Sequence, residues 1–247
     1  MREWGRRIVS KILFSLAKVT LWRFHPVVFA IAGSTNKAST KRAILERLPK
    51  TAAVRAHVRG YNTEIGLPLV VLDITGGGSS VLAWVAVVIA AFLKTVFVQS
   101  FPKLLVVELG VDAPGDMARL LQLVHPQALI VTTLLDETLR QEYALAVRSV
   151  PPDGCVILNH DDPAIRLLAS DCVAPVRWYG MATDIDVRVE IITETIDGIS
   201  AMITDKKQNT TVSVSSSRYG HHHLYAAAAA IALRGFFNTQ PLWQSAT

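Results

Sequence analysis

Cysteine is nearly absent from this sequence, and no apolar run in it is plainly long enough to cross a membrane. Only Cys155 and Cys172 occur among its 247 residues. They have neither the spacing of a zinc site nor the density of a disulfide framework. The apolar run from Val81 to Leu93 is closed by Lys94, short of the roughly 20 residues that a spanning helix needs. We therefore expect a chain that works in the reducing cytoplasm.

Apolar residues are nevertheless abundant. They make up 51% of the chain, and the mean hydropathy is positive, which raises the question of membrane contact. We predict that residues 81–93 form a buried or surface-docked helix. A spanning helix is the alternative, if the apolar stretch continues past Lys94 to Val98.

The positive charge is concentrated at the N-terminus. Most of the net charge of +5 comes from residues 1–24, while the rest of the chain is close to neutral, so the charge does not indicate a nucleic-acid partner. Basic and apolar residues alternate there at the spacing of an amphipathic helix. Such a helix either lies on the inner face of an anionic membrane or packs on its own domain with its basic face in solvent.

Apolar runs alternate with helical segments along the remaining chain. Strands are expected at 27–32, 52–58, 104–109, 128–132 and 155–158, and helices at 38–48, 64–72, 114–124, 136–147, 161–169 and 222–233. Residues 173–216 have alternating, β-branched character, with a hairpin turn at Asp197-Gly198. The pattern predicts an α/β fold with a mostly parallel sheet flanked by helices and a small β-rich excursion. Ligands bind such sheets at the carboxyl ends of the strands.

A turn after the first apolar run is typical of a phosphate-binding loop. It consists of Gly33, Ser34, Thr35, Asn36, Lys37, Ala38 and Ser39. The full pattern has glycine before the lysine and Ser or Thr after it, whose hydroxyl binds magnesium. Asn36 is tolerable in place of glycine, because asparagine accepts a positive φ. Ala38 removes the hydroxyl, and only a shift that brings Ser39 or Thr40 into its place would restore it.

Several segments together resemble the central ATPase domain of the Mur ligases. GSTNKASTK, YNTEIGLPL, LVVELGVDAPGDM, HPQALIVTT, VILNHDD and GHHHLYAAAAA occur in the family's order and at nearly its spacing. The likeness covers residues 26–235 and is closest to the branch that adds D-alanyl-D-alanine to UDP-N-acetylmuramoyl-tripeptide. It implies a P-loop type domain of peptidoglycan precursor synthesis that uses ATP and Mg²⁺. Such enzymes phosphorylate a carboxylate, and an amine then attacks the acyl phosphate to form an amide.

The resemblance also implies roles for individual residues. Lys37 would neutralise the β- and γ-phosphates together with the amides of the loop, Gly33 to Ser39. Glu108 would hold magnesium, with Ser39 as the candidate hydroxyl ligand; otherwise Glu108 caps the next turn. Further nucleotide contacts are implied for Asn62 near the phosphates, for Asn159 and Asp162 near the ribose, and for His222 at the adenine. As alternatives, Asn62 is an ordinary turn residue and Asp162 a helix cap.

Other positions depart from the family pattern. Thr133 and Ala226 stand where the family has asparagines, and Arg148 lies near the place of a lysine that becomes carbamylated. The segment 134–151 is also several residues short and lacks a histidine that helps to hold a second magnesium. Because these departures involve the metals and the nucleotide, they predict a retained fold with impaired catalysis. Neighbouring histidines on a helix point in different directions, so His221 to His223 do not predict a metal site.

We expect three parts: a basic helix over residues 1–25, a Mur ligase-like ATP-binding domain over 26–237, and a tail over 238–247, with the family's C-terminal domain absent. Three functions stay open. The first is a Mur-type ligase, with UDP-N-acetylmuramoyl-peptide and D-alanyl-D-alanine as partners by resemblance. The second is a non-catalytic pseudoenzyme that acts as a binding module. The third is a membrane-associated protein whose apolar helices matter more than the loop.

Overall fold

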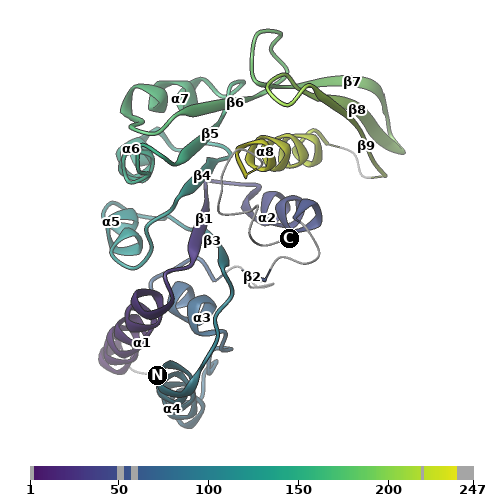
Figure 1. Ribbon diagram of the computed structural model, residues 1–247. Coiled ribbons are helices and arrows are strands. Elements are labelled where there is room, and N and C mark those ends of the chain that lie inside the picture. Colours follow the sequence, from purple (N-terminus) through teal and green to yellow (C-terminus); the bar gives the residue numbers. More distant parts are fainter. Residues whose placement is uncertain (1–2, 49–52, 57–60, 218–219, 238–247) are drawn as a thin grey trace.

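The computed structural model has a single sheet with helices on both faces (Figure 1). It describes residues 3–48, 53–56, 61–217 and 220–237. The strand order in the sheet is β2-β3-β1-β4-β5-β6-β7-β8-β9. The strands are β1 (Val27–Ala32), β2 (Val54–Ala56), β3 (Leu104–Leu109), β4 (Ala128–Val131), β5 (Cys155–Asn159), β6 (Val176–Gly180), β7 (Val187–Thr195), β8 (Gly198–Asp205) and β9 (Thr210–Ser216).

The sheet is parallel from β2 to β7 and antiparallel from β7 to β9. The two parts differ in burial for a physical reason. Every residue of β3 and β4 is buried, because helices cover both faces of a parallel sheet. In β8 buried and more exposed residues largely alternate, as in a sheet with one solvated face. The predicted α/β fold, with its mostly parallel sheet and β-rich excursion, is confirmed.

The helices divide between the two faces. They are α1 (Glu3–Phe24), α2 (Lys37–Arg47), α3 (Gly66–Leu72), α4 (Val81–Phe97), α5 (Asp116–Leu121), α6 (Arg140–Arg148), α7 (Pro163–Arg166) and α8 (His222–Phe237), with 3₁₀ turns at Glu137–Leu139 and Leu167–Asp171. Helices α2 and α8 pack together on one face, over Phe29 and Ile31 of β1. The other helices contribute to the core on the opposite face, over Val28 and Ala30. Strand β1 is thus covered on both sides.

Some elements differ from the sequence-based expectation. The segment 173–216 is not wholly an excursion, because β6 pairs in parallel with β5 and extends the main sheet. The helix predicted at 136–147 begins with a 3₁₀ turn, and the helix predicted at 161–169 ends in one. Strand β2 is shorter than the predicted 52–58, and the flanking residues 52, 57 and 58 lie outside the described residues. The predicted tail, 238–247, is also outside them.

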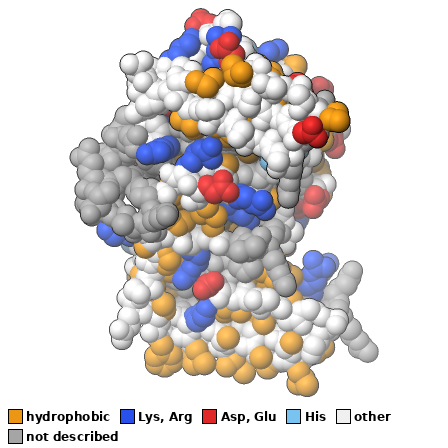
Figure 2. Space-filling model, turned by 90° about the vertical axis from the view of Figure 1, so that its right-hand side faces the viewer, with side chains coloured by type: hydrophobic (Ala, Val, Ile, Leu, Met, Phe, Trp, Pro, Cys, Tyr) orange, Lys and Arg blue, Asp and Glu red, His pale blue; other side chains and the backbone are white. Residues whose placement is uncertain are grey.

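Helices α1 and α4 pack against each other at the lower end of Figure 1. Thr20 in α1 donates a hydrogen bond to the Thr95 hydroxyl in α4 (3.4 Å), and Trp84, Val87 and Ala91 bury one side of α4. The lower end of the molecule is covered by hydrophobic side chains (Figure 2). None of the helices in the described parts of the chain combines the length and apolar character that crossing a bilayer requires.

Candidate functional site

The turn between β1 and α2 presents backbone amides at the carboxyl end of β1. Asn36 adopts a left-handed conformation (φ 65°) and its side chain makes no capping hydrogen bond. The first helical hydrogen bond runs from Thr40 N to Asn36 O (3.0 Å). The amides of residues 37–39 therefore have no partner within α2, and the helix dipole adds partial positive charge. This arrangement suits an anion such as phosphate.

Two threonines at the end of β4 hold the turn in shape. The Thr133 hydroxyl accepts a hydrogen bond from Thr35 N (3.0 Å), and Thr132 donates to Thr35 O (2.6 Å). A Cβ on Gly33 would lie 2.1 Å from the Thr132 hydroxyl, and Gly33 has a φ of +135°. A side chain at residue 33 would therefore disrupt the turn. Thr133 therefore supports the loop.

The Lys37 ammonium lies over the turn. Its Nζ donates to Gly33 O (2.5 Å) and Ser34 O (3.4 Å). Burial lowers the pKa of Lys37 from its usual value of 10.5, while the negative charges of Glu108 and Asp112 act in the opposite direction. The cation is thus already placed beside the amides that a phosphate would contact.

Glu108, at the end of β3, is already paired with a cation. Lys41 Nζ lies 2.5 Å from Glu108 Oε1, and both side chains are more than nine-tenths buried. Lys41 follows Lys37 by four residues, so the two point from the same side of α2. Ser39 lies elsewhere: it lines a pocket with Ala38 and strand β9 that Glu108 does not reach. The structure therefore brings Lys41, and not Ser39, to Glu108.

A pocket of about 420 Å³ opens beside the loop, within the usual range for small-molecule sites. It lies between the ends of β4 and β5 and the start of α8. Its lining consists of Asn36, Thr40, Thr132, Thr133, Asn159, Asp161, Asp162, Pro163, Tyr179, His221, His222, Tyr225 and Ala226. The predicted residues Asn36, Asn159, Asp162 and His222 thus share one cavity.

Hydrogen bonds organise the wall of this pocket. Asp161 accepts from the Tyr225 hydroxyl (2.8 Å) and from Met181 N (2.7 Å). Burial raises the pKa of Tyr225, and its bond to Asp161 adds to the rise, so Tyr225 stays a proton donor at neutral pH. Asn159 donates from Nδ2 to Thr132 O (3.2 Å) and accepts from Asp161 N (3.1 Å). The amide nitrogen and the amide oxygen of Asn159 thus both hold the loops that follow β4 and β5.

Asp162 acts as a helix cap. One carboxylate oxygen accepts from Ala164 N (3.0 Å) and Ile165 N (3.3 Å) at the start of α7, and the other accepts from Leu134 N (2.9 Å). Helix capping, the alternative role for Asp162, therefore uses one of its carboxylate oxygens, and the hydrogen bond from Leu134 N uses the other.

Asn62 does not line the pocket of about 420 Å³. It lies against Gly110, whose amide donates to Asn62 O (2.9 Å).

The histidines at the start of α8 have separate surroundings. His222 lines the pocket and contacts His223, with ring centroids 3.9 Å apart and the ring planes tilted by 42°, while His221 lies 3.0 Å from Glu194. Over the described parts of the chain, no three His, Cys, Asp or Glu side chains are grouped to hold a metal ion.

Burial raises the pKa of Cys155 to about 12 and that of Cys172 to about 11, so neither thiol is an activated nucleophile.

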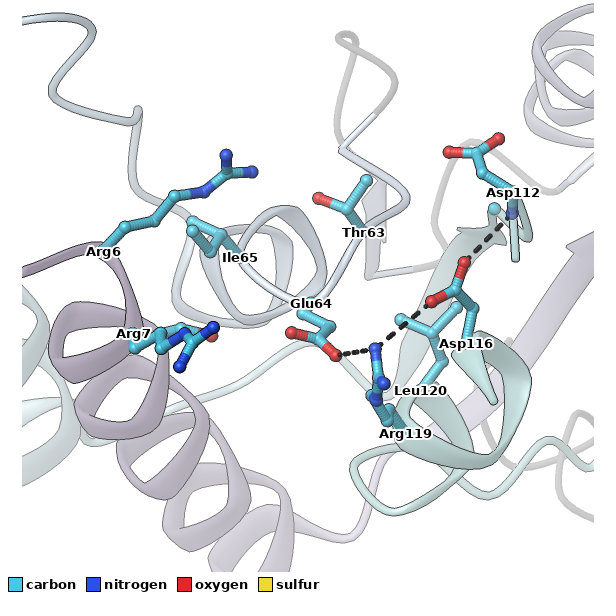
Figure 3. A pocket seen from close by; sticks show the side chains of 11 residues that line it. Arg6, Arg7, Thr63, Glu64, Ile65, Asp112, Asp116, Arg119 and Leu120 are labelled. Carbon is cyan, nitrogen blue, oxygen red and sulfur yellow. Dashed lines mark hydrogen bonds and ion pairs between the residues drawn. The ribbon is translucent and has the colours of Figure 1, made fainter. Parts of the chain in front are cut away.

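A second pocket, of about 390 Å³, lies near the end of β3. Figure 3 shows Arg6 and Arg7 of α1 on one side of it and a chain of polar contacts on the other. Arg119 lies 2.9 Å from Glu64 and 3.4 Å from Asp116. The N-terminal helix therefore contributes cations to the same edge of the sheet as the phosphate-binding turn.

Two residues of the site were not anticipated from sequence. Lys41 repeats the position of Lys37 one helical turn later, and Tyr225 follows His222 by three residues on α8. Helical spacing could have placed each beside its predicted neighbour. Their partners, Glu108 and Asp161, come from distant parts of the chain, which periodicity does not reveal.

Known proteins match this chain over most of its length. The family model described as "Mur ligase middle domain" matches residues 91–234. The UDP-N-acetylmuramoyl-tripeptide--D-alanyl-D-alanine ligase of Bacillus subtilis is 24% identical over 93% of this chain and 45% of its own length. The UDP-N-acetylmuramoyl-L-alanyl-D-glutamate--2,6-diaminopimelate ligase of Geobacter metallireducens is 38% identical over 36% of this chain and 17% of its own length.

Solved structures have the same fold. The MurF ligase of Thermotoga maritima in complex with ADP has a TM-score of 0.68 at 18% identity, covering 94% of this chain and 50% of that one. MurF of Acinetobacter baumannii has a TM-score of 0.67 at 16% identity, covering 93% and 47%. The chain thus spans about half the length of these proteins.

Proposed function

The chain belongs to the Mur ligase family, through its middle domain, and on this premise we propose that it is an ATP-binding domain of a Mur-type amide ligase with impaired catalysis. The observation that carries the proposal is the turn of Gly33 to Lys37. An uncapped helix N-terminus, a left-handed Asn36 and a preplaced lysine ammonium converge there. By resemblance, the complete reaction belongs to peptidoglycan precursor synthesis.

The proposed binding mode uses the turn for the phosphates and the adjoining pocket for the nucleoside. Lys37 and the amides of residues 37–39 would hold the β- and γ-phosphates. The pocket beyond Asn36 leads to His222 and Ala226 on α8, where the adenine would lie. Ala226 is apolar and buried, so it offers no side-chain hydrogen bond to the adenine edge. We therefore expect weak affinity and little discrimination between bases.

Magnesium, which the resemblance implies, does not fit the residues present. A magnesium ion needs oxygen ligands, but Glu108 already pairs with Lys41 and Ala38 has no hydroxyl. Ser39 lines a different pocket. The Lys41 ammonium supplies positive charge that would otherwise come from the ion. We therefore propose phosphate binding without a metal, in which Ser39 contributes its amide but its hydroxyl is not a metal ligand.

The direct test is calorimetric titration of ATP with and without magnesium. We expect weak binding of similar affinity in both conditions. A folded chain that gives neither heat nor a thermal shift with ATP would contradict the proposal. Full ligase activity of this chain with UDP-N-acetylmuramoyl-tripeptide and D-alanyl-D-alanine would contradict impaired catalysis.

Magnesium dependence should be recoverable by substitution. In an Ala38→Thr/Lys41→Met variant, a hydroxyl returns beside the phosphates and Glu108 loses its cation. We expect magnesium to raise the ATP affinity of this variant by about tenfold or more, the value of one or two charge-assisted contacts. Titration with and without magnesium measures the effect. The matched control is Ala38→Thr/Lys41→Arg, which keeps a cation on Glu108 and should show no such gain; an equal gain in both would show that Lys41 does not block the ion.

A non-catalytic binding module is the second candidate function. The Glu108–Lys41 pair and the absence of a hydroxyl at Ala38 favour it. Both leave fewer groups to bind a metal, while the fold and the phosphate turn persist. ATP binding without hydrolysis or amide formation, even when the other domains of a Mur ligase are supplied in trans, would distinguish this module from an enzyme.

A further inference from the structure

Helix α4 has an exposed face made wholly of apolar side chains. Leu82 is 82% exposed and Phe97 is 70% exposed. The exposed large apolar residues of α4 recur at helical spacing and are Val81, Leu82, Val85, Ile89, Phe92, Leu93, Val96 and Phe97. No charged residue interrupts this face, and the only cation of α4, Lys94, is tied to Asp73 O (2.5 Å) at its edge. Soluble monomers rarely expose so continuous an apolar surface, which marks an interaction site.

Helix α1 adds a second exposed apolar strip. The strip consists of Trp4, Ile8, Ile12, Val19 and Trp22, and the two tryptophans are 76% and 74% exposed. Arg23 donates to the carbonyls of Thr95 and Val96 (both 3.3 Å), so the ends of α1 and α4 meet. Tryptophan favours the boundary between apolar and polar regions of a bilayer. Two such residues near the ends of one helix suit a helix that lies in that boundary.

The charge on the two helices has one sign. Cations are present at Arg6, Arg7, Lys11, Lys18, Arg23 and Lys94, and from Trp4 onward neither helix contains Asp or Glu. Lys11 and Lys18 are exposed and lie within one turn of the apolar strip. Basic side chains beside an apolar face complement anionic headgroups above acyl chains. A protein partner for this surface would have to combine an apolar groove with acidic rims.

We propose that the exposed faces of α1 and α4 form a surface that docks on anionic phospholipid bilayers. The helices lie in the headgroup region and do not cross the bilayer, since no described helix is long and apolar enough. Figure 2 shows hydrophobic side chains gathered at the lower end of the molecule, where Figure 1 has α4. The phosphate-binding turn lies between β1 and α2, outside this surface. Membrane docking and nucleotide binding can therefore be tested with different variants.

The test is flotation of the full chain with vesicles. Vesicles that contain phosphatidylglycerol and phosphatidylcholine should bind the chain. Pure phosphatidylcholine vesicles should bind it at least about tenfold more weakly, because each cation near an anionic surface raises the binding constant about fivefold. A Leu82→Ser/Ile89→Ser variant should lose about tenfold or more of the binding. Both positions are exposed, so the variant should fold. Ile196→Ser is the matched control, since Ile196 is 90% exposed in the β7–β8 turn.

The charge component has its own comparison. Lys11→Glu and Lys18→Glu should each weaken binding to anionic vesicles by about fivefold or more, whereas Arg140→Glu, an exposed position on α6, should not. Wild-type chain that stays unbound to anionic vesicles would overturn the proposal. So would a dimer in solution that Leu82→Ser/Ile89→Ser dissociates, because a second copy would then cover the face.

Discussion

The Lys37→Ala variant should lose measurable ATP binding. The Lys37 ammonium lies over the phosphate turn, 2.5 Å from Gly33 O, and a charge-assisted contact is worth about 1.5–3 kcal/mol. Removing it should lower the affinity at least tenfold, which leaves a weak site with no detectable heat. Calorimetric titration of both proteins with ATP measures the effect. The turn itself should persist, because Thr132 and Thr133 hold it.

A matched lysine elsewhere controls for net charge. Lys206 also donates to a backbone carbonyl, Thr183 O (2.8 Å), but it lies in the β8–β9 turn and does not line the pocket beside the phosphate turn. Lys206→Ala should therefore bind ATP as the wild type does. Equal affinities for wild type and Lys37→Ala would exclude the phosphate-turn interpretation.

Because burial lowers the pKa of Lys37, its positive charge, and with it the ATP affinity, should begin to fall at a lower pH than for an exposed lysine.

Most of the fold could be predicted because its signals are local. The run at 104–109, apolar except for Glu108, and the run predicted at 128–132 indicate strands buried on both faces, and β3 and β4 are such strands. The family was also identified correctly from the order of short motifs. The 3₁₀ turns at helix ends, as at Leu167–Asp171, depend on tertiary packing and are not encoded in periodicity.

The site was predictable in its parts but not in its pairings. The sequence predicts that the turn residues and the ends of β3, β4 and β5 lie at one edge of the sheet, because the carboxyl ends of parallel strands meet there. That Lys41 reaches Glu108, or that Tyr225 reaches Asp161, depends on how α2 and α8 pack on the sheet. These pairings change the interpretation of the site, because the structure has the buried Lys41 ammonium beside Glu108, where the motif alone suggests a metal.

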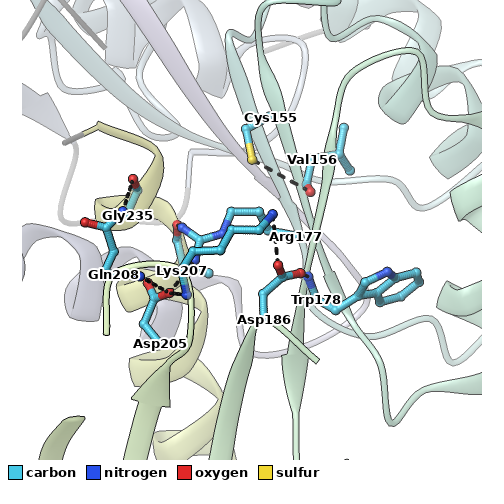
Figure 4. A network of polar contacts seen from close by, with 10 residues as sticks. Cys155, Val156, Arg177, Trp178, Asp186, Asp205, Lys207, Gln208 and Gly235 are labelled. Carbon is cyan, nitrogen blue, oxygen red and sulfur yellow. Dashed lines mark hydrogen bonds and ion pairs between the residues drawn. The ribbon is translucent and has the colours of Figure 1, made fainter. Parts of the chain in front are cut away.

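Loss of the buried ion pair between β6 and β8 should destabilise the whole domain. Arg177 Nη2 donates to Asp205 Oδ1 (2.8 Å), and both residues are at least 95% buried. Arg177 also donates to Ala232 O of α8 (2.6 Å), and Asp205 accepts from the amides of Lys207 (3.1 Å) and Gln208 (3.2 Å). The network in Figure 4 therefore ties the antiparallel extension to the parallel sheet and to α8. Asp205→Ala leaves a guanidinium buried without its counter-charge.

We expect Asp205→Ala to lower the free energy of unfolding by about 3–5 kcal/mol, since breaking one side of a buried pair costs that much. For a domain of this size the melting temperature should fall by about 10 °C. Urea denaturation measures the free energy of unfolding and a thermal scan measures the melting temperature, each followed by circular dichroism. Asp184→Ala is the control, because the Asp184–Lys206 pair is exposed and its atoms are 3.5 Å apart, and such pairs contribute about 0–1 kcal/mol. Similar losses in the two variants would show that the buried network does not hold β7–β9 to the sheet, whereas partial recovery in Arg177→Met/Asp205→Leu would confirm that the unpaired charge causes the loss.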